Sequence, residues 1–383
     1  MRVAIVAGEL SGDALGAGLM RELRVRRPEV VFEGIGGPAM AGQGLDSLEP
    51  MESLSLMGLT EVLRHLPRLL RLRGDLYRRW ADDPPDVFVG VDLPDFNLSL
   101  ERRLRAAGVP TVHYVSPTVW AWRRGRVRGI RRSVDRMLTL YPFEEAFYAG
   151  SGIDAVCVGH PAADRYPLEP DTAAARARLG VPEAATLVAL LPGSRRSEVG
   201  HLMESFAGAA AILARRDDAP RFVVPVAAPR LRDAIVAALK EHGVLERCLL
   251  LDGDTATAVT AADAVLTASG TATLETMLAQ RPMVVAYRLS PVTFFLMKLL
   301  IRVPWVAKPN LLAGEELVPE HFQRDASAEP LAAAVARWLD DPAASAEVAK
   351  RFRALHGELA RGADARAAEA VLATALRDAG RAG

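Results

Sequence analysis

The chain has 383 residues, half of them hydrophobic and a quarter charged, which is a globular composition and excludes a disordered protein. Lys plus Arg and Asp plus Glu number 47 each, so the overall charge points to no class of partner. The length exceeds one ordinary hydrophobic core and predicts two domains of roughly 170–200 residues each. Cys157 and Cys248 lie far apart, which argues against a disulfide framework or a zinc site and fits reduced thiols in the cytoplasm.

The first part of the chain alternates apolar runs with amphipathic segments, a pattern typical of βαβ units and a parallel sheet. We predict strands at Val3–Ala7, Val30–Ile35, Val87–Val91, Thr111–Val115 and Arg136–Leu140. The opening run is short and acidic residues follow it at once, so it indicates a strand and not a signal peptide.

A proline-rich stretch, Pro161–Pro170, predicts a linker, after which the alternation resumes. The strands predicted there are Leu187–Leu191, Phe222–Val226, Cys248–Leu251, Ala264–Thr267 and Met283–Tyr287. The tail from about Ala328 is alanine-rich and helical. Charged residues interrupt the longest apolar stretch, Met283–Val306, so we expect no membrane-spanning helix.

The turn after the first strand, Gly8–Asp13, places acidic groups where a dinucleotide's pyrophosphate would sit, which argues against a dehydrogenase. Carboxylates at the edge of a sheet suit the binding of sugar hydroxyls. The alternative is that Glu9 and Asp13 only stabilise the positive end of a helix that Ser11 caps.

Two carboxylates in Gly90–Asn97 directly follow a hydrophobic strand, a position that is costly unless they are solvated or bonded. Asp92 is the candidate general base, and Asp95 is a candidate helix cap. The alternative is a pair of ordinary loop carboxylates.

The next strand leads into His113–Trp122, whose tryptophans either complete a core or form a wall for an acceptor. Arg123–Arg136 is either a solvated helix face or a site for phosphate or anionic lipid.

The segment Met57–Tyr77 has leucines at helical spacing with arginines between them. It predicts an amphipathic helix that either packs on a sheet or lies at the interface of an anionic membrane. Pro67 predicts a break or a kink in this helix. The candidate membrane- or acyl-facing residues are Leu59, Val62, Leu63, Leu66, Leu69 and Leu70.

The second part opens with a strand, a glycine turn and a helix at Ala189–Glu198. The free N–H groups of a helix start and its positive dipole end suit a diphosphate, and Arg195 adds a charge with bidentate geometry. Gly193 forms the turn and Ser194 is the expected N-cap. On these residues alone an ordinary turn beside a solvated arginine explains the stretch equally well.

A second turn of the same kind, at Ser269, Gly270 and Thr271, favours the anion site. Glu275 lies one turn into the following helix, where it can accept hydrogen bonds from ribose hydroxyls or merely complement the dipole. Pro309–Gly314 predicts a loop from which Asn310 can reach a cleft.

Taken together, six motifs in order resemble the lipid-A-disaccharide synthase family of GT-B glycosyltransferases over essentially the whole chain. They are Val6–Asp13, Val89–Asn97, His113–Trp122, Leu190–Arg195, Ala268–Glu275 and Pro309–Gly314.

The resemblance implies transfer from UDP-2,3-diacylglucosamine to 2,3-diacylglucosamine 1-phosphate, with inversion, to give the β-1,6-linked lipid A disaccharide 1-phosphate and UDP. It implies that Asp92 is the essential acidic residue and Arg195 the nucleotide-side arginine, and that Glu9, Ser11 and Asn310 contribute to activity. We also expect no cofactor, no metal and no nucleic-acid partner, since the sequence shows no cluster of metal ligands. The resemblance also implies a peripheral location on the cytoplasmic face of the inner membrane, and it suggests a homodimer.

We therefore expect an α/β fold of the GT-B type, with two Rossmann-like domains whose parallel sheets face each other across a cleft. Residues 1–165 form the acceptor and membrane-facing domain, on which helices from about 345 to 383 pack back, and residues 172–344 form the UDP-sugar-binding domain. The alternative enzyme is a UDP-sugar 2-epimerase of the same architecture. A third hypothesis is a non-catalytic UDP-sugar-binding protein at the membrane.

Overall fold

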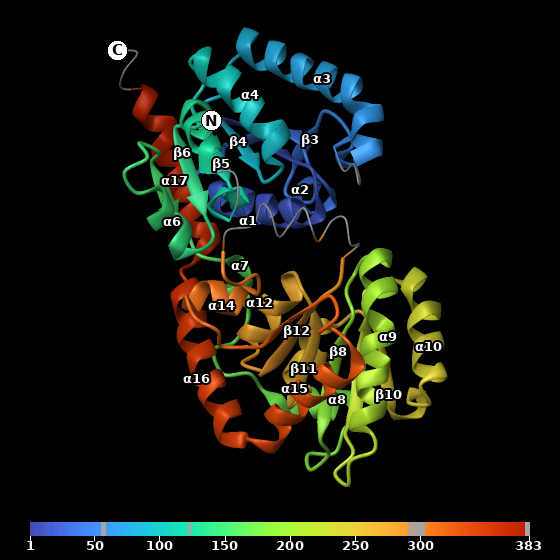
Figure 1. Cartoon of the computed structure of the whole chain (residues 1–383). Coiled ribbons are helices and arrows are strands. Elements are labelled where there is room, and N and C mark those ends of the chain that lie inside the picture. The colour runs from blue at the N-terminus through green and yellow to red at the C-terminus, as the bar shows by residue number, and fades with distance from the viewer. Residues whose placement is uncertain (55–58, 122–123, 290–293, 295–302, 380–383) are drawn as a thin grey trace. The chain divides into compact units, whose positions relative to one another are not determined.

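The computed structural model of this chain describes residues 1–54, 59–121, 124–289, 294 and 303–379 (Figure 1). The chain divides into two compact units. The first consists of Met1–Asp164 together with Leu359–Gly383, and the second of Arg165–Glu358.

A seven-stranded parallel sheet forms the centre of the first unit, in the order β3-β2-β1-β4-β5-β6-β7. Its strands are β1 (Arg2–Ala7), β2 (Val31–Ile35), β3 (Leu45–Ser47), β4 (Val87–Val91), β5 (Thr111–Tyr114), β6 (Arg136–Thr139) and β7 (Ala155–Cys157). The residues of β4 are all buried, which is expected of a parallel strand covered by helices on both faces. The five strands predicted for this part are therefore confirmed.

The helices of the first unit are α1 (Leu10–Arg26), α2 (Pro38–Ala41), α3 (Leu59–Asp82), α4 (Pro94–Ala106), α5 (Val127–Ser133), α6 (Pro142–Tyr148), α7 (Pro161–Arg165) and α17 (Ala363–Ala379). Helices α3 and α4 pack side by side on one face of the sheet (Figure 1). The indole ring of Trp80, on α3, lies 5.3 Å from the ring of Phe88 on β4. Helix α17 returns to pack along α1, and Arg21 and Asp364 form an ion pair of 2.8 Å between them.

Of the break or kink expected at Pro67, the break is wrong, because α3 runs unbroken from Leu59 to Asp82 with the proline inside it. A proline removes one backbone hydrogen bond, a cost that tertiary packing can offset. Here Leu69 and Leu72 pack against the core of the first unit, and Leu76 and Trp80 belong to that core. The packing of these side chains holds the helix beyond the proline.

The second unit repeats the pattern with a six-stranded parallel sheet in the order β10-β9-β8-β11-β12-β13. Its strands are β8 (Leu187–Leu191), β9 (Arg221–Val226), β10 (Cys248–Asp252), β11 (Ala264–Ala268), β12 (Met283–Tyr287) and β13 (Glu320–Phe322). Its helices are α8 (Thr172–Leu179), α9 (Arg196–Leu213), α10 (Arg232–Glu241), α11 (Thr255–Ala261), α12 (Thr271–Leu278), α14 (Lys308–Ala313), α15 (Ala328–Asp340) and α16 (Pro342–Leu359). The five strands predicted for this part are also confirmed.

The return of the chain to the first unit begins at Leu359 and not at about residue 345. Helix α16 stays with the second unit because its side chains bond there. Ser345 Oγ donates to the carbonyl oxygen of Trp338 at 2.7 Å, and Arg353 pairs with Glu169 at 2.6 Å. Along the described part of the chain, no helix combines the length and the hydropathy needed to cross a bilayer.

Both sheets have the strand order of a doubly wound fold. The chain adds strands outward from the first strand of the sheet in one direction, then returns to the other side of that strand and adds the rest in the opposite direction. The reversal lies between β1 and β4 in one unit and between β8 and β11 in the other. Ligands of such folds bind beyond the carboxyl ends of the strands at this point. We therefore expect ligands to bind at the turns that follow these four strands.

Candidate functional site

A pocket of about 430 Å³ in the second unit lies at the carboxyl ends of β8 and β11. This volume is within the usual range for small-molecule sites. The seven residues expected on the substrate side all line it, namely Gly193, Ser194, Arg195, Ser269, Gly270, Thr271 and Glu275. We call this pocket the cradle.

One wall of the cradle is the turn between β8 and α9. Gly193 has a φ of 112°, a conformation that favours glycine, and a Cβ there would lie 2.6 Å from the Cβ of Glu198. Arg195, not Ser194, is the N-cap of α9, so the expected cap is wrong. The reason is that the carboxylate of Glu198, in the first turn of the helix, accepts the backbone N–H groups of both Ser194 and Arg195.

The electrostatic character of this wall is mixed. The side chain of Arg195 is 62% exposed, and its Nη1 lies 3.7 Å from Oε1 of Glu198. A long side chain at this distance from its partner is weakly held and can turn toward a ligand. Sequence reasoning did not assign a role to Glu198, because the expected cap, Ser194, lies four residues before it and not the three of a capping box.

The opposite wall is the turn between β11 and α12. Gly270 is the N-cap of α12 with a φ of 134°, a region that side chains rarely adopt. Thr273 Oγ1 donates to the carbonyl oxygen of Gly270 at 2.8 Å and fixes the turn. Gly270 and Thr271 are exposed, so the N-terminus of α12 opens toward solvent. Two helix starts therefore line one pocket.

Glu275 lies one turn into α12 and is partly buried. Burial raises the pKa of its carboxyl group above the ordinary range. Burial raises the pKa of the Tyr166 phenol, and the nearby charges of Glu275 and Asp254 raise it further. Tyr166 falls within the predicted linker and was not among the expected site residues.

In the first unit, Asp92 directly follows β4 and is partly exposed. Asp92 and Leu93 have φ values of 51° and 48°, in the left-handed region that non-glycine residues rarely adopt. Strained backbone of this kind clusters at functional sites. Asp95 does not cap α4, because Leu93 is the N-cap, and it pairs with Arg126 at 2.6 Å.

Glu9 and Ser11 follow β1, the neighbour of β4 in the sheet, and both are exposed. Glu9 occupies the N-cap position of α1. Asp13, by contrast, is buried and accepts the backbone N–H groups of Gly37, Ala39 and Met40 at 2.9 Å each. Its carboxylate serves the start of α2, whereas Glu9 and Ser11 remain accessible.

Asn310 lies in helix α14 and not in a loop, and it is fully buried. Its Nδ2 donates to the carbonyl oxygen of Val318 and to Oε1 of Glu320, both at 2.9 Å. Its Oδ1 accepts the backbone N–H groups of Leu317 and Val318 at 2.8 and 3.0 Å. A side-chain amide can form four such bonds, so the expectation that Asn310 reaches a substrate is wrong.

The expected membrane-facing side chains divide into two groups. Leu66 and Leu70 are 41% and 47% exposed, whereas Leu69 packs against the core of the first unit and does not face outward. The side chains of Leu59, Val62 and Leu63 lie outside the described residues. The exposed pair is four residues apart and therefore occupies one face of α3.

The proposed aromatic wall is not found at Trp120, which is buried and donates its Nε1 hydrogen to Glu144 at 3.2 Å. Its ring also meets the ring of Phe143 edge-on at 4.8 Å, so it completes a core. Trp122 lies outside the described residues. Arg136, at the end of the arginine run, is buried and pairs with Asp154 at 2.7 Å, which makes it structural.

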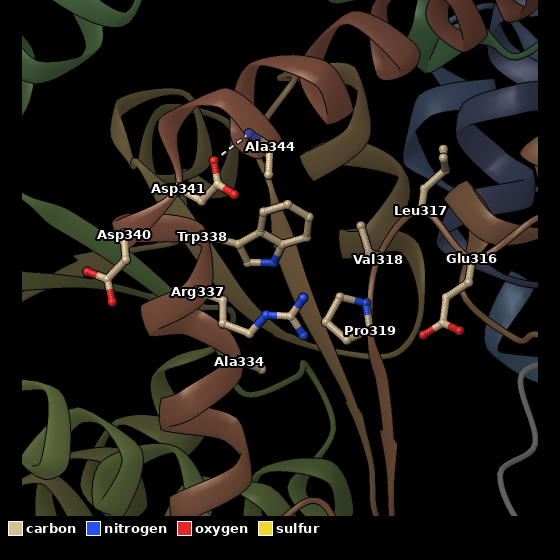
Figure 2. A pocket seen from close by; sticks show the side chains of 10 residues that line it. All are labelled: Glu316, Leu317, Val318, Pro319, Ala334, Arg337, Trp338, Asp340, Asp341 and Ala344. Atoms are coloured by element: carbon tan, nitrogen blue, oxygen red, sulfur yellow. Dashed lines mark hydrogen bonds between the residues drawn. The ribbon is translucent and has the colours of Figure 1, made fainter.

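A second pocket of the same unit, of about 450 Å³, contains none of the expected site residues (Figure 2). Three of its polar side chains bond to other parts of the fold. Trp338 Nε1 donates to the carbonyl oxygen of Met283 at 3.1 Å, and Asp341 accepts the backbone N–H of Ala344 at 2.9 Å. Asp340 pairs with Arg216. In the described residues, no group of three or more His, Cys, Asp or Glu side chains is placed to hold a metal ion.

Comparison with known proteins agrees with these features. The family model described as lipid-A-disaccharide synthetase matches residues 3–371. The lipid-A-disaccharide synthase of Alkalilimnicola ehrlichii is 60% identical over 377 residues, which cover 98% of this chain and 99% of that protein. The lipid-A-disaccharide synthase of Chromohalobacter salexigens is 52% identical over 371 residues, covering 97% of this chain and 96% of that protein.

Among solved structures, the glycosyltransferase of kitacinnamycin superposes with a TM-score of 0.65 at 17% identity, covering 97% of this chain and 98% of that one. This likeness shows the fold, which is α/β of the GT-B type. The family match extends over nearly the whole chain and the relatives share more than half of their residues with it. The chain therefore belongs to the lipid-A-disaccharide synthase family of glycosyltransferases.

Proposed function

We propose that this chain joins UDP-2,3-diacylglucosamine to 2,3-diacylglucosamine 1-phosphate and releases UDP, in a single displacement that inverts the anomeric centre. The observation that carries the proposal is the convergence of all seven expected donor-side residues on the cradle. Membership of the family supports the synthesis of the lipid A disaccharide in general. The choice of donor and acceptor and the stereochemistry are the parts proposed here.

In this proposal the diphosphate of the donor lies against the starts of α9 and α12. Free N–H groups at a helix start and the positive end of its dipole stabilise an anion. Arg195 contributes a mobile guanidinium, and the ribose hydroxyls donate to Glu275. The same groups stabilise the charge that builds on the diphosphate as it leaves.

Asp92 is the general base of the reaction. It removes the proton from the 6-hydroxyl of the acceptor while that oxygen bonds to the anomeric carbon of the donor. The bond from that carbon to the diphosphate breaks, and the electron pair leaves with UDP. Attack from the face opposite UDP gives the β linkage. Glu9 and Ser11, at the end of the adjacent strand, bind acceptor hydroxyls.

The acyl chains of the substrates and the surface of the inner membrane contact the outer face of α3. The exposed Leu66 and Leu70 support this contact, and Arg71 lies exposed beside them. A leucine face bordered by arginine suits an interfacial helix on an anionic bilayer. The enzyme is thus peripheral, on the cytoplasmic face of that membrane.

The test is the release of UDP by purified protein in mixed micelles that contain both lipid substrates. We expect release that depends on the acceptor and a product with a β-1,6 linkage by NMR. Asp92→Asn should lower turnover by about 10²–10⁴-fold, the usual contribution of a general base. Asp95→Asn is the matched control, because Asp95 lies in the same turn but is exposed and paired with Arg126. It should leave turnover unchanged.

Conversion of the donor to its C2 epimer without acceptor, with UDP still attached, would instead favour the epimerase alternative. The UDP-GlcNAc 2-epimerase of Neisseria meningitidis shares the fold, with a TM-score of 0.64 at 12% identity over 98% of this chain and all of that one. Failure to release UDP under any condition would contradict the transferase assignment, and failure to change the sugar at C2 as well would contradict both enzyme assignments. Normal turnover in Asp92→Asn would contradict the assignment of the base alone.

A further inference from the structure

Asn97, at the end of the first turn of α4, is fully buried beneath the ends of two strands. Its Nδ2 lies 2.9 Å from the carbonyl oxygen of Asp92, 3.3 Å from that of Val6 and 3.4 Å from that of Val91. These carbonyl groups belong to the end of β1 and to the end of β4 with the residue that follows it. One side-chain amide therefore joins the turn that carries Asp92 to the strand that leads into Glu9 and Ser11.

The backbone of Asp92 is held on both sides. Its N–H donates to the carbonyl oxygen of Tyr114, on β5, at 2.7 Å, and its carbonyl oxygen accepts from Asn97. Both Asp92 and the next residue, Leu93, are in the left-handed region. Residues other than glycine persist in such conformations only where the surroundings over-determine them. Asn97 is the side chain that supplies this constraint on the carbonyl side.

The position of Asn97 depends in turn on a space beneath β4. Gly90 has no side chain, and a Cβ there would lie 2.9 Å from the Cβ of Asn97 and 2.2 Å from Oε1 of Glu101. Glu101 reaches across this space to His113, the partner of Gly90 on β5, with 2.7 Å between Oε1 and Nδ1. Both side chains are fully buried, so α4 is fastened to the sheet next to Asn97.

We propose that Asn97 is a positioning residue that fixes the direction of the Asp92 carboxylate and couples the turn after β4 to the turn after β1. The proposal rests on the proposed role of Asp92 as the base. Asn97 itself is fully buried and does not touch a substrate.

The test compares Asn97→Asp with wild type in the full chain. Asp has nearly the same shape as Asn but replaces the donating Nδ2 with an oxygen that faces three carbonyl oxygens. We expect kcat to fall at least tenfold while the Kd for UDP stays within twofold, since UDP is assigned to the second unit. The ratio of kcat in the variant to kcat in wild type should rise as pH falls, because a protonated carboxyl group regains a donor.

Thr111→Val is the matched control. Thr111 lies at the amino end of β5, and its Oγ1 lies 3.1 Å from each of two acceptors for its one hydrogen, the carbonyl oxygen of Ser133 and Oδ2 of Asp135. The change is isosteric and removes buried hydrogen bonds from the same unit. It should lower the melting temperature but leave kcat and its pH profile as in wild type.

Hydrogen exchange gives a readout that does not depend on catalysis. The backbone amide of Asp92 should exchange at least tenfold faster in Asn97→Asp, together with the amides of residues 8–11, and neither should change in Thr111→Val. If Asn97→Asp does not fold, Asn97→Ala provides the same comparison. A folded variant with wild-type kcat, or with unchanged exchange at these amides, would overturn the role of Asn97. Absence of acceptor-dependent UDP release by wild type would overturn the proposed function instead, and exchange would still decide the inference.

Discussion

Glu198 Oε2 lies 3.0 Å from the backbone nitrogen of Ser194, at the helix start where we place the diphosphate of the donor. The same oxygen also accepts the backbone N–H of Arg195 at 3.1 Å. A carboxylate from the chain thus uses two of the N–H groups that an anion would use. Its negative charge opposes that of a bound diphosphate.

Glu198→Gln should therefore bind UDP more tightly than wild type. The amide oxygen of Gln can still accept the two N–H groups, but the negative charge is gone. We expect Kd to fall about fivefold, the effect of roughly 1 kcal/mol, as measured by calorimetry at low salt, and the gain should shrink in high salt. Glu204→Gln is the control, because Glu204 lies on the same helix and pairs with His242. Weaker binding by Glu198→Gln would mean that the carboxylate supports the cradle.

The partly buried carboxyl group of Glu275 gives UDP binding a distinctive pH dependence. Burial raises its pKa, so protonation of the acceptor for the ribose hydroxyls begins at a higher pH than for an ordinary carboxylate. As pH falls through that raised pKa, the affinity of wild type for UDP should decrease. The affinity of Glu275→Gln should not share this change. The phosphates of UDP titrate equally in both experiments, so the ratio of the two Kd values isolates Glu275.

The raised pKa of Glu275 also predicts how the stability of the fold depends on pH, with the opposite sign to its effect on UDP binding. A carboxyl group whose pKa is raised in the folded state binds its proton more tightly there than in the unfolded state. Its contribution to stability is present at low pH and is lost as pH rises through the raised pKa. Without UDP, Glu275→Gln should therefore gain stability relative to wild type as pH rises, measured by thermal unfolding. A constant difference across pH would contradict the shift.

The exposed pair on α3 predicts how the protein binds to membranes. Replacing Leu66 and Leu70 together with Ser should reduce sedimentation with anionic vesicles at least tenfold, because two leucine side chains no longer enter the bilayer interface. UDP binding should be unchanged. Val25→Ser is the control, because Val25 is 71% exposed on α1 of the same unit and has no assigned role. Equal losses in the pair and the control would contradict an interface on α3.

Much of the fold followed from the sequence because buried parallel strands are continuous apolar runs bounded by turn residues. All ten predicted strands are present. The missed strands β3, β7 and β13 lie at the edges of their sheets and have three residues each, too few for a periodic pattern. The residues that line the cradle could also be predicted from the sequence, because a glycine turn between a strand and a helix determines the backbone locally.

Other errors concern side chains whose surroundings come from elsewhere in the chain, unlike the local misassignment of the helix caps at Ser194 and Asp95. Leu69 sits among leucines at helical spacing, and only the packing of α3 decides that it faces inward while Leu70 does not. Asn97 stood inside a recognised motif, yet its carbonyl partner on Val6 is 91 residues away in sequence. Local patterns carry no information about such contacts.

Asn310 allows a direct test of a structural role against a catalytic one. Its amide holds the backbone of residues 317 and 318 and the carboxylate of Glu320, whose pKa burial raises. Asn310→Ala leaves the backbone groups of Leu317 and Val318 without this partner, at a cost of about 1–3 kcal/mol for each unsatisfied group, while Glu320 keeps the backbone N–H groups of Val306 and Ala307. We expect a melting temperature many degrees below that of wild type and a loss of UDP binding that follows the loss of folded protein.

The control for this prediction is Gln323→Ala. Gln323 also uses its amide to hold backbone, accepting the N–H of Leu289 at 2.8 Å and donating to its carbonyl oxygen at 2.9 Å. At temperatures where both variants are equally folded, they should retain similar turnover, since neither amide reaches a substrate. A loss of turnover in folded Asn310→Ala that is a hundredfold greater than in Gln323→Ala would restore a catalytic role for Asn310. Its burial and four satisfied hydrogen bonds argue for the structural outcome.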